Sequence, residues 1–145
     1  MLHRESILVE LEKRMTQVTG VSFVARNPEA DPGINDLPCI NIFEMADRVM
    51  ETHGRGGAPV YKREIQIVLE TFIKGTKEAK STKELMAFLK LVKVKLYEVP
   101  AGLGGLVYRI REDEFSRVHR PGIGDHVAGI GMALTLVYVE DTSNY

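Results

Sequence analysis

The hydrophobic and polar positions between Ser81 and Tyr97 repeat with the period of an α-helix. At about 100° per residue, five apolar side chains fall in one arc, which is typical of a helix that packs one face against a core. These five are Leu85, Phe88, Leu89, Val92 and Leu96. Ser81 and Glu84 have the spacing of a capping box, which predicts that the helix begins at Ser81. Leu91 and Val94 lie outside the arc, so they are candidates for contact with a partner.

The remaining pattern predicts one more helix and a set of strands. Residues 3–19 carry a second apolar stripe with helical spacing, and Gly20 is placed to end that helix. Alternation of apolar and polar residues predicts strands at Val21–Arg26, Cys39–Met45, Tyr61–Lys74, Leu106–Asp113 and Val127–Glu140. In the last strand one side is apolar, and the other carries small residues such as Gly129 and Gly131, which permit a close approach. The order of elements predicts an α+β fold, with two helices packed on one face of a mainly antiparallel sheet of about four to five strands.

Residues 46–60 keep no sustained period and contain three glycines. This pattern predicts a mobile loop at about 46–60 inside a single domain that spans residues 1–145. Glycine-rich loops on a rigid scaffold often carry contacts, although a hairpin tip without a role is the plainer alternative. The candidate interaction residues of the loop are Arg48, Glu51, His53 and Arg55.

The two longest strands are long for a domain of this size. Strands of about 14 residues extend about 46 Å, whereas the helix over Ser81–Tyr97 covers only about 25 Å. Either the strands are bent by bulges, or their ends project past the helices. Projecting half-apolar strand ends are prone to aggregate when left bare, so a partner subunit is the simplest cover for them.

Composition narrows the class of protein without pointing to a chemistry. The chain has 145 residues, 44% of them hydrophobic, which suits one domain with its own core. A formal net charge of −1 gives no overall attraction for nucleic acid, and the lysines of the second helix are interleaved with glutamates. No apolar run approaches the length of a membrane span. These features, with a mixed-charge N-terminus and a lone cysteine, predict a protein of the cytosol or one assembled there.

The sequence predicts no catalytic residue, no cofactor-binding residue and no metal ligand. His119, Asp125 and His126 flank a Pro-Gly turn, but their spacing matches no structural zinc pattern. Cys39 alternates within a strand and is expected to be a small core residue. The glycines around Gly104 follow a helix instead of preceding one, so they do not form a phosphate-binding loop. An enzyme is therefore not expected.

The order of elements resembles the tail-terminator proteins of long-tailed bacteriophages, the minor tail protein U type. The segments that carry the resemblance cover nearly the whole chain: Leu2–Thr19, the strand Leu37-Pro-Cys-Ile-Asn-Ile-Phe43, Tyr61–Ile73, Lys83–Tyr97 and Val127–Glu140. The likeness is one of architecture and pattern. It implies a small α+β domain with a strand pair joined by a long mobile loop.

The resemblance also implies a structural role. Such a protein forms a ring, expected to be a homohexamer, that caps the tail tube, ends its polymerisation and joins the tail to the head. Its expected partners are other copies of itself, the tail tube protein and a head-completion or connector protein. DNA is expected to pass through the lumen without sequence-specific binding, and no membrane is involved. The expected location is the host cytoplasm during assembly and then the virion tail.

Other readings stay open at this point. A different tail or head–tail joining subunit would have the same general character. A small module that binds a protein or a ligand fits the composition equally well. The quaternary state, and the presence or absence of an apolar pocket lined by titratable groups, would separate these classes.

Overall fold

The computed structural model describes residues 2–54, 57–75, 78–118 and 127–145. The helices are α1 (His3–Thr16), α2 (Glu78–Leu96) and the short α3 (Ala101–Gly105), with 3₁₀ turns at Ile34–Asp36 and Thr142–Asn144. The strands are β1 (Phe23–Arg26), β2 (Cys39–His53), β3 (Val60–Lys74), β4 (Arg109–Arg117) and β5 (Val127–Asp141). This is the α+β architecture that the hydrophobic pattern predicts.

The described strands form one sheet of five in the order β1-β2-β3-β5-β4. β1 runs parallel to β2, and every other neighbouring pair is antiparallel. The long strands β2, β3 and β5 have 15 residues each and form the centre of the sheet. The sheet is therefore mainly antiparallel, with β1 and β4 at its two edges.

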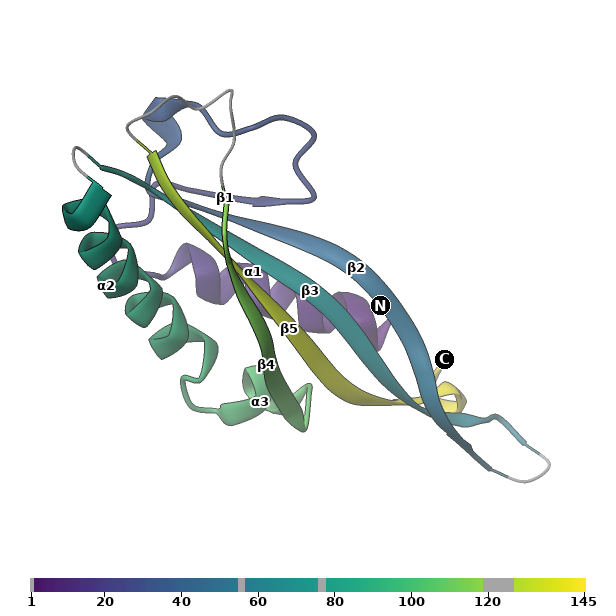
Figure 1. Cartoon of the computed structure of the whole chain (residues 1–145). Coiled ribbons are helices and arrows are strands. Elements are labelled where there is room, and N and C mark those ends of the chain that lie inside the picture. Colours follow the sequence, from purple (N-terminus) through teal and green to yellow (C-terminus); the bar gives the residue numbers. More distant parts are fainter. Residues whose placement is uncertain (1, 55–56, 76–77, 119–126) are drawn as a thin grey trace.

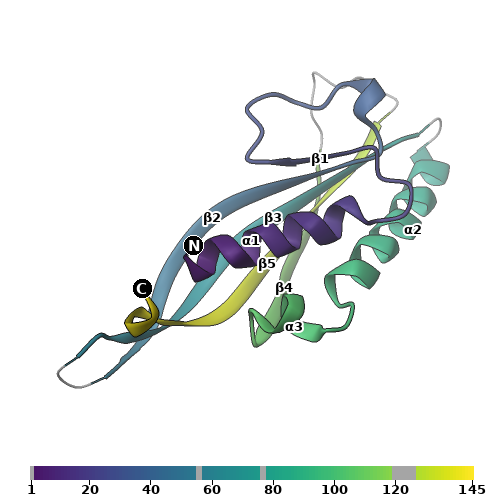
Figure 2. The same cartoon turned by 180° about the vertical axis from the view of Figure 1, so that it is seen from behind.

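Helices α1 and α2 lie on the same face of the sheet (Figure 2). The core forms between this face and the apolar stripes of the two helices, where Leu11, Leu85 and Leu96 are fully buried. The strands contribute the side chains that alternate toward the helices: Ile65, Ile67 and Leu69 from β3, and Met132, Leu134 and Leu136 from β5. The stripe predicted for the second helix is thus confirmed. None of the described helices covers the opposite face of the sheet (Figure 1).

The prediction of a mobile loop at about 46–60 is wrong for most of its length. Residues 46–53 continue β2 as far as His53, and β3 begins at Val60, so the two strands form one long hairpin. Two register shifts, between Glu44 and Asp47 and between Val49 and Glu51, interrupt the alternation of β2. Each shift inserts an extra residue, so a strict period of two disappears from the sequence although the strand continues.

The start of α2 and the glycine-rich segment after it also differ from prediction. α2 begins at Glu78 and not at Ser81, so the capping-box pattern lies inside the helix. Glutamate, alanine and lysine are good helix formers, which is why the preceding residues extend the helix. The turn expected near Gly104 is present as α3, and Gly102 there has φ +67. A Cβ on Gly102 would lie 2.1 Å from the Val107 carbonyl oxygen, so this position requires glycine.

A buried arginine joins the two main helices. The Arg14 side chain of α1 is only 4% exposed, and its guanidinium donates hydrogen bonds to three main-chain carbonyls, one in the last turn of α2 and two in the segment that follows it. These belong to Lys95 (3.3 Å), Glu98 (2.6 Å) and Pro100 (2.9 Å). The last carbonyls of a helix have no intrahelical partner, and the C-terminal end of the dipole favours a cation. Arg14 therefore caps α2 from a neighbouring helix.

Candidate functional site

The β2–β3 hairpin extends well beyond the start of α1 (Figure 1). Three of the predicted interaction residues, Arg48, Glu51 and His53, lie on this hairpin within β2, and all three are exposed. The fourth, Arg55, lies outside the described residues. The cross-strand register pairs Arg48 with Glu64, Glu51 with Lys62, and His53 with Val60. The hairpin therefore presents these side chains on an extended strand and not on a loop.

The bulge between Val49 and Glu51 determines which face these residues occupy. In an uninterrupted strand, residues 48 and 51 would point to opposite faces of the sheet. The extra residue restores Glu51 to the side of Arg48, because both now pair with even-numbered residues of β3 whose side chains face away from the helices. Arg48, Glu51 and His53 consequently share the uncovered face of the sheet.

A row of alternating charges crosses this uncovered face. Arg48 Nη2 lies 3.2 Å from Glu64 Oε2, and Arg111 Nη1 lies 3.8 Å from Glu64 Oε1. Arg111 Nε then donates to Asp113 Oδ1 at 2.6 Å, and the Thr135 hydroxyl donates to Asp113 Oδ2 at 2.5 Å. Partial burial opposes ionisation of Asp113, but these two hydrogen bonds outweigh it and lower its pKa. The positive charges of the row are therefore compensated by carboxylates beside them.

Sequence reasoning did not find this row of charges. Arg109, Arg111 and Asp113 stand at alternate positions of a predicted strand, which was the available signal. Their partners on β3 and β5 are 22 or more positions away in the chain, and only the strand register brings them together.

The sheet has two edges with strand backbone available for pairing. β1 pairs with β2 only from Cys39 to Ile42, so in the described part of the chain β2 has only β3 beside it between Met45 and His53, and its outer edge there is open. β4 is the last strand at the other side of the sheet. Apolar side chains along the open part of β2 are exposed, with Met45 at 62% and Met50 at 46%. Such edges readily accept another strand.

The outer face of α2 carries exposed apolar side chains as well. Leu91 and Val94, the two residues predicted to lie outside the core stripe, are 38% and 55% exposed. Met86 of the same helix is also exposed, at 42%. An amphipathic helix at a protein surface normally presents polar residues to water, so this face has the composition of a contact surface.

A network of ion pairs fixes the base of the hairpin to α1. Arg4 donates to both Glu44 and Asp47 of β2 at 2.8 Å. Arg26 of β1 bonds to Glu44 as well, at 3.2 Å, and to Glu5 of α1 at 2.7 Å. Partial burial by itself raises the pKa of Glu44, but its hydrogen bonds, among them those from Asn27 and Arg26, outweigh burial and lower it. The network holds the first bulge of β2 in place.

This network makes the stability of the protein sensitive to acid. A carboxyl group whose pKa is lower in the folded state stabilises the fold above its unfolded pKa, and this contribution is lost as pH falls through the folded pKa. Glu44→Gln should therefore lower the free energy of unfolding by about 2 kcal/mol at pH 7, since hydrogen bonds to charged groups contribute about this much. The difference from the wild type should shrink as pH falls below 4.5, the ordinary pKa of this group.

Urea unfolding from pH 7 to pH 3 would measure this effect. The exposed Glu114 on β4 offers a control, because Glu114→Gln should change stability by no more than about 0.5 kcal/mol. A difference between the Glu44→Gln variant and the wild type that stays constant over this pH range would contradict the role of the Glu44 charge.

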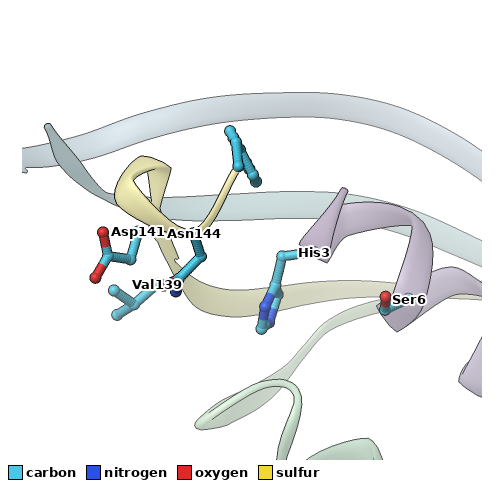
Figure 3. Close-up of a pocket in the computed structure, with 6 residues that line it drawn as sticks. His3, Ser6, Val139, Asp141 and Asn144 are labelled. Carbon is cyan, nitrogen blue, oxygen red and sulfur yellow. The ribbon is translucent and has the colours of Figure 1, made fainter. Parts of the chain in front are cut away.

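A polar pocket of about 320 Å³ opens between the start of α1 and the end of β5 (Figure 3). Its lining residues are His3, Ser6, Val139, Asp141, Asn144 and Tyr145. The His3 ring stacks on Tyr138 with 5.3 Å between centroids, and its Nε2 lies 2.7 Å from the Leu106 carbonyl oxygen. The Ser6 hydroxyl donates to the Leu2 carbonyl. Both groups are thus engaged with the main chain, and the contacts of His3 with Tyr138 and Leu106 link the start of α1 to the sheet.

The sequence also raised a histidine–aspartate group and Cys39 as candidates for chemistry. His119 and Asp125, with His126, lie outside the described residues, and the described part of the chain holds no cluster of three potential metal ligands. Cys39 is fully buried, and burial raises the pKa of its thiol to about 12, as expected for a core residue. Among the described helices none has the length and apolar character needed to span a membrane. No family model matches the chain, and no curated protein matches it either.

Proposed function

We propose that this chain is a structural virion-assembly protein of a phage or prophage, a subunit of a ring that caps the tail tube and joins the tail to the head. The observation that carries the proposal is the long β2–β3 hairpin, which extends past the helical layer with an open strand edge from Met45 to His53. A 15-residue strand spans about 50 Å, against about 28 Å for the 19 residues of α2. A neighbouring subunit is the natural cover for the excess length.

The sheet supports a contact of the kind that closes a ring. A heterologous interface joins two different surfaces of the same subunit and closes by rotation. The open part of β2 and the edge strand β4 are two such surfaces, one at each side of the sheet. β2 and β4 also run in opposite directions within the sheet, so a β4 edge would meet the β2 edge of the next copy in the favoured antiparallel sense.

The uncovered face of the sheet suits a surface along which DNA passes. Two of its arginines, Arg48 and Arg111, are paired with Glu64 and Asp113, so these two are not available as bare cations for phosphate groups. In the proposed ring of six copies this face borders the lumen. The other partners are the tail tube protein on one side of the ring and a head-completion or connector protein on the other.

The mass of the purified chain in solution tests the proposal. Light scattering over a range of concentrations should give a multiple of the 16.2 kDa chain, expected to be six, and electron micrographs should show a ring with a central hole. Met45→Lys with Met50→Lys places two charges on the open β2 edge and should reduce the assembly to single subunits at an unchanged melting temperature. Val9→Lys, on an exposed site of α1, is the matched control and should assemble normally. A chain that remains a single subunit at every concentration would contradict the ring.

A further inference from the structure

The outer face of α2 differs from its other faces in both charge and polarity. Its exposed residues between 82 and 96 are Thr82, Lys83, Met86, Ala87, Lys90, Leu91 and Val94. The exposed charged side chains in this range are therefore both lysines. A partner that fits this surface must combine acidic groups with an apolar contact.

One segment of the same chain has this chemistry. Residues 27–36 contain Glu29, Asp31 and Asp36 and no lysine or arginine. Ile34 stands among them at 48% exposure, on the 3₁₀ turn between β1 and β2. The segment thus combines an exposed apolar side chain with three acidic residues close to it in the sequence.

The acidic segment is held in a defined shape. At its start, the Asn27 amide donates to the Ile42 carbonyl at 2.7 Å, and the Asn27 side chain accepts from the Glu44 amide at 2.9 Å. At its end, Asp36 accepts a hydrogen bond from the Gly33 amide at 2.8 Å. A fixed conformation reduces the entropy that is lost when the segment binds a partner.

The two surfaces belong to opposite edges of the subunit. α2 packs on β3 and β5 and reaches β4 with its side chains, since Lys93 Nζ is 2.7 Å from Glu112 and 4.8 Å from the centre of the Phe115 ring. The acidic segment joins β1 to β2, at the other edge of the sheet. Complementary surfaces at opposite edges of one subunit are what a head-to-tail contact between copies requires.

We infer that the outer face of α2 docks residues 27–36 of a neighbouring copy of this chain, with Ile34 against Leu91 and Val94 and the lysines near the acidic groups. This inference rests on the proposed ring and names its second contact. The backbone hydrogen bonds of two strand edges do not distinguish one partner from another. The contact between α2 and residues 27–36 adds specificity through complementary charges.

Engineered cysteines test the inference directly. The sole native cysteine, Cys39, is fully buried, so new thiols at exposed sites report on their own surroundings. The variant with Ile34→Cys and Val94→Cys should form a ladder of disulfide-linked subunits under mild oxidation, because each copy carries both halves of the contact. Combining Ile34→Cys with Val9→Cys, at a site on α1 with a similar 44% exposure, should abolish the ladder.

The outcomes separate this inference from the proposed function. A ladder in the first variant, absent from the control, supports the contact. If the wild-type protein forms rings but the first variant gives no ladder, the contact is overturned and the ring stands. The outer face of α2 then belongs to another partner. Wild-type protein that stays a single subunit and gives no ladder overturns both. As a second measure, Lys90→Glu should weaken assembly, and mixing it with the Glu29→Lys chain should restore part of the loss.

Discussion

Replacing Arg14 by methionine should remove about 3–5 kcal/mol from the free energy of unfolding, the usual result of breaking a buried charged interaction. The variant removes the three hydrogen bonds that Arg14 donates to the carbonyls of Lys95, Glu98 and Pro100, and it removes the ion pair of Glu10 at 3.0 Å. Native domains have only about 5–15 kcal/mol in total, so the loss takes a large part of the stability. Urea unfolding would measure it, and the melting temperature should fall by about 10–15 °C.

Two further variants identify the cause. Lys13→Met, at the neighbouring exposed position of α1, removes a charge of the same sign and should change stability by no more than about 0.5 kcal/mol. Arg14→Lys keeps the charge but loses the planar fork that reaches several carbonyls at once, so its stability should lie between those of the wild type and Arg14→Met. An Arg14→Met variant as stable as Lys13→Met would show that the guanidinium does not cap α2.

Local periodicity explains what sequence reasoning could find. The helices and most strand positions follow from apolar spacing within single segments, as with the stripe of α2 and the alternation of β3. The exposure of Leu91 and Val94 follows from the same helical geometry. These features need no knowledge of the rest of the chain.

Features that depend on distant partners were not accessible in this way. The two bulges of β2 break its alternation, so the strand beyond Met45 looked like a loop until the register with β3 was available. The role of Arg14 was equally inaccessible from the sequence, because its carbonyl partners lie 81 to 86 positions away. The alternating charges at Arg48, Glu64 and Arg111 belong to three different strands. Register and topology, and not composition, bring these groups together.

The correction at residues 46–60 changes how the proposed assembly works. A mobile loop would lose conformational entropy when it binds, whereas a strand held by β3 is already ordered. The network around Glu44 and Asp47 fixes the point where the hairpin leaves the helical layer. The hairpin therefore presents its open edge in one orientation, as repeated contacts around a closed ring require.

A second large effect is expected at Gly129 on β5, where the sequence predicts a close approach. The approaching group is the chain's own Phe72, because a Cβ added to Gly129 would lie 2.6 Å from two atoms of that ring and 2.9 Å from the Val118 carbonyl oxygen. Gly129→Ala should therefore lower the free energy of unfolding by about 2–3 kcal/mol, as overpacking of a well-packed site does.

Gly131 on the same side of β5 provides a matched control for this prediction. A Cβ there would lie 3.3 Å from a methyl group of Val118, which has room to adjust, and alanine in place of glycine also reduces the entropy of the unfolded chain. Gly131→Ala should thus change stability by less than about 1 kcal/mol. The double variant Phe72→Leu, Gly129→Ala should lose less stability than the sum of the losses of the two single variants. Phe72→Leu removes the ring that the new Cβ at residue 129 would otherwise meet. Strict additivity of the two changes, measured by urea unfolding, would show that the ring is not what excludes a side chain at residue 129.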